Sequence, residues 1–384
     1  MKKGEYVMVF VVFAGIVLTL VVGVLSCLSW WKANVAASKV FFWLIVTLLI
    51  TNMFYTVFNI KSITFKPLKE VMIFLSAVTF IVLIYTSLIM MIKYVLGFLL
   101  GAFLRPENRF VHFVKETKIT VPVLLAATTL LGVVGYINAG IIRTSDYEIN
   151  VNKGSEKKSL TAAVVSDTHI GICAHKSTID TIVEKINEMQ PDVVFLLGDI
   201  FDENTTTDEM EYFSEKFKDV KSRYGSFFVY GNHENMQNED VAKYIKEAGV
   251  TILEDSSAVI AGDITVVGMR SEYDSVGYPI EKVLEKSKAD KTKPVIVLKH
   301  EPLGLKEIAA QGADISMHGH THGEQFPLTY LPFSFMNDMM SGLKQFGDMT
   351  AFTTQGAGGW GFHFKFPAKC EVAKVTINIT PKSK

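Results

Sequence analysis

Five short stretches in the second half of the chain end apolar runs with residues that bind metal ions. They read Asp167-Thr168-His169, Gly198-Asp199-Ile200-Phe201-Asp202, Gly231-Asn232-His233-Glu234, Lys299-His300-Glu301 and Gly319-His320-Thr321-His322. Carboxylates, imidazoles and one amide oxygen, gathered at strand ends, are what a two-metal hydrolytic site requires. The stretches therefore predict hydrolysis assisted by two divalent cations.

Each stretch alone is a weak signal, because an Asp at the end of a strand is more often a turn or cap residue than a ligand. Five such stretches in series are a stronger signal. Six of the nine histidines of the chain also lie in these stretches or directly beside them. The joint pattern is that of one site rather than of five independent caps.

The elements that must position these residues begin at about residue 145, where short β-rich runs alternate with helical ones. The predicted strands are Leu160–Ser166, Val193–Leu197, Ser226–Tyr230, Ile264–Gly268 and Val295–Leu298. The predicted helices are Ser177–Met189, Asp208–Val220, Glu239–Ala248 and Ile280–Lys288. This rhythm predicts an α/β domain over residues 145–384, with its site at the carboxyl ends of the strands.

The motifs, in their order along the chain, resemble the signature of the calcineurin-like metallophosphoesterase superfamily. That signature is D-x-H, G-D-x-x-D, G-N-H-E, H and G-H-x-H, and the resemblance covers about residues 158–380. Gly319–Gly323 followed by Gln325 resembles the bacterial membrane-associated branch, some members of which have several N-terminal spans. The resemblance implies a four-layer αββα sandwich.

The resemblance also implies a set of metal ligands. One metal falls to Asp167, His169, Asp199 and His322, and the second falls to Asp199, Asn232, His300 and His320. Asp199 would thus bridge the two ions, as a carboxylate shared by two cations commonly does. Mixed oxygen and imidazole ligands suit Mn, Fe or Zn, and the sequence does not choose among these metals.

A mechanism follows from this assignment. A hydroxide bridging the two metals would attack phosphorus in line, and His233 would act as general acid toward the leaving group. Asp202 is predicted to hold the His233 ring. Glu203 stands where the protein Ser/Thr phosphatases carry Arg, and the loss of that phosphate clamp disfavours a phosphoprotein substrate.

Residues 1–144 are predicted to be a transmembrane anchor of about four helices. Four uncharged stretches reach the roughly 20 residues that cross a bilayer: Tyr6–Trp31, Val40–Ile60, Val71–Ile92 and Ile119–Ile142. The shorter apolar run Tyr94–Leu104 either extends the third helix or lies in the interface. No acidic residue lies inside the spans, which favours anchoring over transport.

The side of the membrane on which the second half lies depends on basic residues that nearly balance. Lys2 and Lys3, with three lysines between the second and third spans, favour a cytoplasmic domain. The densest basic segment contains Arg105, Arg109, Lys115 and Lys118 in the third connecting loop. The positive-inside rule would make that loop cytoplasmic, which favours an extracytoplasmic catalytic domain.

The predicted protein is a multi-pass cell-membrane phosphoesterase that hydrolyses a phosphoester or pyrophosphate bond. Its expected partners are the lipid bilayer and a small-molecule or lipid-linked phosphoester substrate. The lipid-linked substrate is a hypothesis that rests on the anchor and on the apolar segment Phe326–Gly361, which would also be ordinary as core.

Two alternatives remain open. One is a cytoplasmic-facing nucleotide phosphodiesterase, and the other is a non-catalytic membrane sensor with a ligand-binding phosphoesterase domain. Nucleic-acid binding is not expected, because residues 143–384 carry 26 basic and 35 acidic side chains and no basic stripe.

Overall fold

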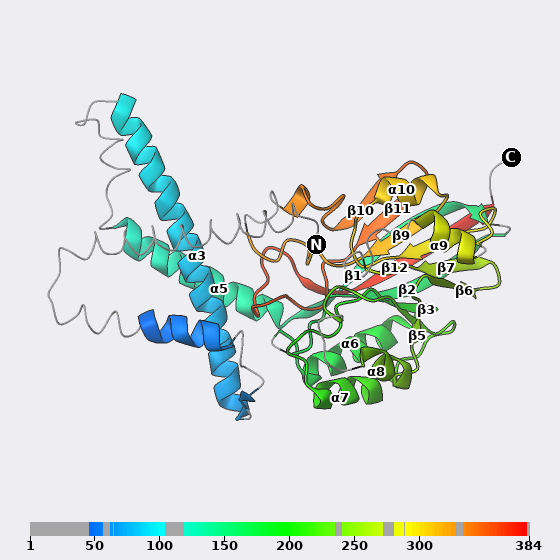
Figure 1. The fold of residues 1–384 in the computed structure, drawn as a ribbon, viewed down its shortest axis with the longest axis horizontal. Helices are drawn as coiled ribbons and strands as arrows, with labels where there is room; N and C mark the ends of the chain where they lie inside the picture. The colour runs from blue at the N-terminus through cyan, green and yellow to red at the C-terminus, as the bar shows by residue number, and fades with distance from the viewer. Residues whose placement is uncertain are drawn as a thin grey trace. The chain divides into compact units, whose positions relative to one another are not determined.

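The computed structural model describes residues 46–56, 62–63, 65–103, 119–154, 156–171, 173–234, 240–271, 280–287, 289–327 and 333–381. The chain forms two compact units, Met1–Tyr136 and Ile137–Lys384 (Figure 1). The last turn of the helix that ends the first unit already belongs to the second. Residues 142–144, which the sequence placed in the anchor, begin the first strand of the second unit.

The first unit is helical in its described part. It contains a helix at Val46–Thr56, the helix α3 (Lys66–Phe103) and most of α5 (Thr120–Ala139). Of the described helices, α3 and α5 are long and apolar enough to cross a membrane, with mean hydropathies of 2.4 and 1.9. The helix α3 runs unbroken to Phe103, so the run from Tyr94 continues the third predicted span instead of forming a separate interfacial segment.

The structure describes less of the other two predicted spans. Tyr6–Trp31 lies outside the described residues, and the described helix of Val40–Ile60 covers Val46–Thr56. A count of four membrane-spanning helices therefore stays a prediction.

The second unit contains two six-stranded mixed sheets. The first sheet has the order β1 (Ile142–Gly154), β12 (Cys370–Pro381), β2 (Lys158–Val165), β3 (Val193–Leu196), β4 (Ser226–Phe228) and β5 (Thr251–Ile252). The second has the order β10 (Gly342–Phe346), β11 (Met349–Thr353), β9 (Ile315–His318), β8 (Val295–Leu298), β7 (Ile264–Gly268) and β6 (Ser256–Ile260).

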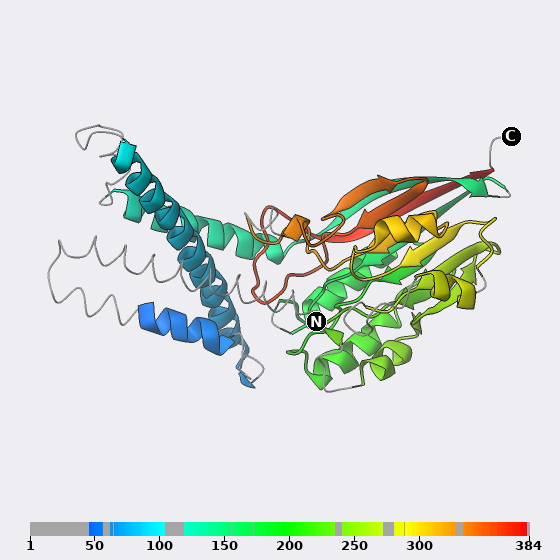
Figure 2. The ribbon, with the colours of Figure 1, turned by 45° about the horizontal axis from the view of Figure 1, so that its top comes forward.

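Helices cover the outer face of each sheet, as Figures 1 and 2 show. The first sheet packs against α6 (Lys176–Met189), α7 (Thr207–Phe217) and α8 (Val241–Glu247). The second packs against α9 (Ile280–Ser287) and α10 (Leu305–Ala310). A third apolar core joins the inner faces of both sheets, with Phe195 and Phe352 from opposite sides. The domain thus has the layer order helix, sheet, sheet, helix.

The parallel strands β2, β3 and β4 are buried on both faces, which explains why their sequences are continuous apolar runs. The strands β7, β8 and β9 of the second sheet are parallel and buried in the same way. Since parallel strands end at one edge of a sheet, the residues that follow them are brought together. These are the residues of the five motifs.

Candidate dinuclear metal centre

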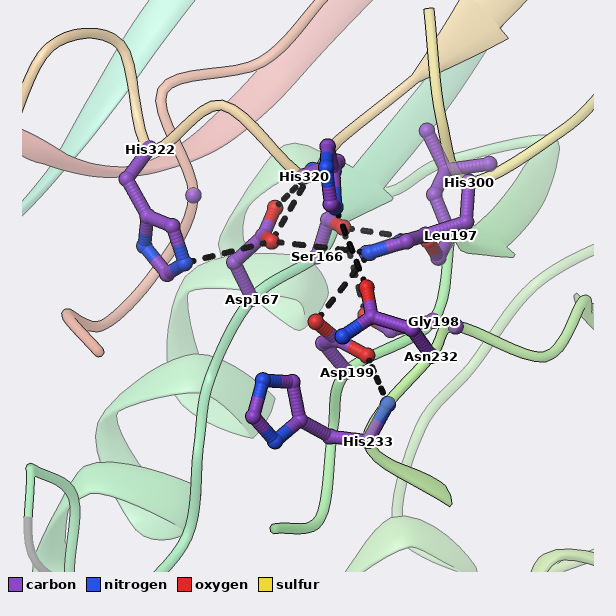
Figure 3. Close-up of polar contacts among 12 residues, drawn as sticks. Ser166, Asp167, Leu197, Gly198, Asp199, Asn232, His233, His300, His320 and His322 are labelled. Atoms are coloured by element: carbon purple, nitrogen blue, oxygen red, sulfur yellow. Dashed lines mark hydrogen bonds and ion pairs between the residues drawn. The ribbon is translucent and has the colours of Figure 1, made fainter. Parts of the chain in front are cut away.

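Each motif starts just after a strand, and both sheets contribute. Asp167 and His169 follow β2, Asp199 follows β3, and Asn232 and His233 follow β4 of the first sheet. From the second sheet, His300 follows β8, and His320 and His322 follow β9. Figure 3 shows the labelled members of this set converging from the different loops: Asp167, Asp199, Asn232, His233, His300, His320 and His322. The structure therefore brings all seven predicted metal ligands, and His233, into one site.

The backbone at the site is held in an uncommon conformation. Asp167, His169, Asp199, His320 and His322 all have positive φ, between 47° and 72°. Residues with side chains populate this left-handed region rarely, and functional sites are where such strain concentrates. Five of the seven predicted ligands thus adopt a conformation that the surrounding fold must enforce.

Glu234 supplies part of that enforcement. Its buried carboxylate accepts hydrogen bonds from the backbone N–H groups of Asp199, Ile200, Phe201 and Gly231, at 2.9, 2.7, 3.2 and 2.8 Å. It therefore ties the loop after β3 to the loop after β4. Burial, and next the charge of Asp199, raise the pKa of Glu234 to about 7. The sequence showed Glu234 as part of a motif without indicating this role.

Close approach of two loops also requires a glycine at position 198. A Cβ there would lie 2.4 Å from the backbone nitrogen of Gly231 and 2.9 Å from Nδ1 of His300. The residue also has a φ of +83°. Only glycine satisfies both conditions without displacing the strand ends that carry Asp199 and Asn232.

The first group of ligand atoms gathers around Asp167. Nε2 of His322 lies 3.6 Å from Oδ1 of Asp167, and Nε2 of His169 lies 3.2 Å from Nε2 of His322. Burial lowers the pKa of His169 to about 3 and, with the charge of Lys365, holds that of His322 well below its ordinary value. Two neutral imidazoles that face each other beside a carboxylate suit a shared cation.

The second group gathers around Asp199. Its Oδ2 lies 3.1 Å from Nε2 of His300 and 3.7 Å from Nε2 of His169. Nδ1 of His320 lies 3.0 Å from Oδ1 of Asn232. Asp199 thus stands between the two groups, as a bridging ligand must. Burial opposes ionisation of the Asp199 carboxyl, but the positive charge of the protonated His300 imidazole outweighs it and holds the pKa of Asp199 far below its usual range.

A test for metal binding is whether the site leaves buried ligand atoms without other partners. Four imidazole nitrogens are buried and make no hydrogen bond in the described part of the chain, and three of them belong to predicted ligands: His169 Nδ1, His300 Nε2 and His322 Nδ1, the fourth being His318 Nε2. Three sets of potential ligands have their ligand atoms within 4.8 Å of one another, namely Asp167, His169 and His322; His169, Asp199 and His233; and Asp199, His300 and His320. The residues fit a pair of divalent cations.

His233 appears in one of those sets, but its ring is held differently from the others. Its Nδ1 lies 2.9 Å from Oε2 of Glu203, and its backbone N–H donates to Oδ1 of Asp199 at 2.9 Å. Burial alone would lower the pKa of His233, yet the Glu203 hydrogen bond and nearby carboxylates raise it. A histidine whose pKa is raised in this way is suited to donate a proton.

The structure does not give Asp202 the contact predicted for it. The hydrogen bond to the His233 ring comes from Glu203. Oδ1 of Asp202 accepts from the backbone N–H of Asn204 at 2.7 Å, and Oδ2 lies 3.9 Å from Nδ1 of His169. Burial raises the pKa of Asp202 to about 7. The turn closed by the backbone N–H of Asn204 directs the Asp202 carboxylate to His169. The side chain of the following residue, Glu203, contacts His233 instead.

Comparison with known proteins agrees with this site. Residues 160–324 match the family model described as calcineurin-like phosphoesterase. A zebrafish protein named "Transmembrane protein with metallophosphoesterase domain" is 30% identical over 273 residues, covering 66% of this chain and 61% of its own length. An uncharacterized metallophosphoesterase of Campylobacter jejuni is 24% identical over 349 residues, covering 90% of each chain.

Residues 160–324 therefore carry the sequence features of a calcineurin-like metallophosphoesterase domain. The chain spans 61% of the length of the zebrafish relative. Because vertebrate proteins match as well, the similarity is not confined to a bacterial branch. Among solved structures, a dimetal phosphatase from Danio rerio covers 51% of this chain and 87% of its own at 12% identity, with a TM-score of 0.35, which is too low to add to the inference.

Proposed function

We propose that this protein is a membrane-anchored dinuclear-metal phosphoesterase that cleaves a phosphoester or pyrophosphate bond. The observation that carries the proposal is Asp199, whose carboxylate lies between two groups of buried imidazoles and carboxylates at the ends of strands from both sheets. When bound, two divalent cations would supply an activated water and neutralise charge on the phosphoryl oxygens.

The chain's own residues would perform the remaining steps. Asp167, His169, Asp199 and His322 would hold one cation, and Asp199, Asn232, His300 and His320 the other. His233 would protonate the leaving oxygen through Nε2, because Nδ1 is occupied by Glu203. A general acid in this position typically contributes roughly 10²–10⁴-fold to the rate.

Membrane anchoring is supported by the apolar helices α3 and α5 and by the zebrafish relative, whose name describes a transmembrane protein. The multi-pass anchor of about four spans, the extracytoplasmic side and a lipid-linked substrate extend the proposal. They rest on the four uncharged stretches of the sequence, on the basic loop after α3 and on the anchor itself.

Two variants of the full chain test the proposal. Asp199→Asn should abolish metal-dependent hydrolysis of an aryl phosphodiester, whereas a fully active Asp199→Asn protein would refute a two-metal mechanism. His233→Ala should retain both metals, measured by elemental analysis, yet lose roughly 10²–10⁴-fold in turnover of alkyl esters. Loss of a metal from His233→Ala would instead make His233 a ligand. Binding of phosphate esters without any turnover by the metal-loaded wild type would favour the sensor alternative.

A further inference from the structure

The last turn of α5 is fixed to the segment that leads into β12. The side-chain amide of Asn138 donates to the carbonyl oxygens of Lys365 and Ala368, at 2.8 and 2.9 Å. The thiol of Cys370 donates to the carbonyl oxygen of Ala139 at 3.3 Å. These contacts lie inside the compact unit that starts at Ile137. Residues 365–370 therefore stay within a few ångströms of the point where α5 ends.

Two aromatic side chains, one in this segment and one shortly before it, are exposed. Trp360 is 50% exposed and Phe366 is 38% exposed. Isolated apolar residues on a surface need no explanation, but Ile137 and Ile141, which flank the contacting residues Asn138 and Ala139 in the sequence, are exposed as well. Exposed apolar side chains thus flank the contacts between the last turn of α5 and residues 365–370.

The backbone that carries these aromatic residues is held in place by a buried residue, Gln325. Gln325 donates from Nε2 to the carbonyl oxygens of Trp360 and Phe362, and its Oε1 accepts from the backbone N–H of Trp360 at 2.8 Å. The backbone N–H of Phe366 donates to the carbonyl oxygen of Gln325 at 3.0 Å. Both aromatic residues are therefore exposed on an ordered loop, not on a frayed one.

Trp360 also adjoins the candidate active site. The centroid of its indole lies 6.2 Å from that of the His233 imidazole. A surface that holds Trp360 at a given depth therefore fixes the proposed general acid at nearly the same depth.

We propose that Trp360 and Phe366 form a bilayer-docking edge, with the headgroup layer of the membrane as its occupant. Tryptophan concentrates at membrane–water interfaces because its ring is apolar while its N–H is polar. The proposal rests on the membrane anchoring proposed above. It deepens that function, because the catalytic site would then open at headgroup depth, where the phosphoester of an amphiphile lies.

Fluorescence quenching by lipids tests the edge in the full chain. The other tryptophans are Trp30, Trp31 and Trp43, and replacing them with Phe leaves Trp360 as the only indole. In proteoliposomes of dibrominated phosphatidylcholine, we expect Trp360 emission to fall to half or less of its value in unbrominated lipid. Quenchers near the headgroup should act more strongly than quenchers deep in the acyl chain.

Two further single-tryptophan chains make the result decisive. With Trp360→Phe and Phe366→Trp, the indole should be quenched as well. With Trp360→Phe and Tyr224→Trp, it should not, because Tyr224 precedes β4 at the amino ends of the strands, opposite the site. Quenching at positions 360 and 366 no greater than in the Tyr224→Trp control would overturn the proposal. Hydrolysis by the wild type is measured separately, so failure of the enzymatic proposal would be recognised independently.

Discussion

Nδ1 of His233 and Oε2 of Glu203 lie 2.9 Å apart, and this contact fixes which nitrogen of the imidazole can face a substrate. Hydrogen bonding at Nδ1 leaves Nε2 as the proton donor. Glu203 is half exposed, with 49% of its side chain accessible. It is thus a positioning residue at the rim of the site, acting through His233.

Replacing Glu203 by Gln should therefore slow the enzyme selectively. We expect turnover of alkyl phosphoesters to fall by about 10-fold or more, as part of the roughly 10²–10⁴-fold that a general acid supplies. Aryl esters, whose leaving groups need little protonation, should be affected far less. The matched control is Asp202→Asn, because the Asp202 carboxylate lies beside His169, whereas the His233 ring is hydrogen-bonded to Glu203. An equal loss for both ester types in Glu203→Gln would contradict the positioning role.

The same contact predicts a titration in the metal-free protein. Burial lowers the pKa of His233, but the hydrogen bond to Glu203 and the neighbouring carboxylates outweigh it, so the folded pKa is raised. Protonated His233 then stabilises the fold fully below the unfolded pKa of about 6.5, and this contribution disappears as pH rises through the folded value. Histidine NMR on chelator-treated protein should show His233 titrating above 6.5, and at lower pH in Glu203→Gln. A value unchanged by Glu203→Gln would remove Glu203 as the cause.

A pair of glycine substitutions can separate packing from backbone conformation at the site. Gly198 and Gly225 both have a φ of +83°, yet a Cβ at Gly225 would meet nothing within 4 Å. Alanine should therefore strain the backbone equally at the two positions and cause a clash only at Gly198. We expect Gly198→Ala to be less stable than Gly225→Ala by about 1–3 kcal/mol.

The measurement is thermal unfolding of the two full-length variants, with metal content determined alongside. The Gly198→Ala variant should also retain less metal, because the loops next to residue 198 contain Asp199, Asn232 and His300. Equal unfolding midpoints would contradict this prediction, because they would show that the loops accommodate a Cβ at position 198 without a loss of stability.

Lys365 predicts a stability effect inside the domain. Its fully buried ammonium donates to the carbonyl oxygens of Gln355, Gly356 and Gly358. That loop in turn donates from the backbone of Gly358 to the carbonyl oxygen of Asp167 at 2.9 Å. Lys365→Met would leave buried carbonyls without donors, at a cost of about 1–3 kcal/mol or more.

Differential scanning of Lys365→Met against Lys369→Met measures this cost. Lys369 is exposed, and its replacement should change stability by no more than about 0.5 kcal/mol. Lys365→Arg should recover part of the stability, because a guanidinium also offers several donors. A Lys365→Met protein as stable as Lys369→Met would show that water satisfies the carbonyls.

The sequence predicted the strands that precede the motifs because those strands are apolar throughout and end in polar residues of distinctive type. It did not predict β1 or β12. The strand β1 alternates polar and apolar residues at the edge of its sheet, and it follows directly after an apolar helix. Its partner β12 lies 228 residues away, where no local pattern connects the two.

Within the site, the residue types predicted the metal ligands but not their supports. Glu234 and Glu203 reach their partners only because the loops that carry them turn in a particular direction. That direction depends on hydrogen bonds formed only in the folded chain. The apolar segment Phe326–Gly361 was ambiguous for a similar reason. Part of it forms the β10–β11 hairpin, with Met339 and Met349 buried, whereas Trp360 is half exposed. Hydrophobicity alone does not separate these two environments.

The pairing of β1 with β12 has a consequence for biosynthesis. The first strand of the second unit, β1, can join its sheet only after residues 370–381 have left the ribosome, because β12 separates it from β2. At a rate of about 5–20 residues per second, this delay is roughly 10–50 s. During that time β1 and one edge of β2 remain without the strand that pairs with both of them. Translation must therefore pass residue 381 before the nascent domain can close its first sheet.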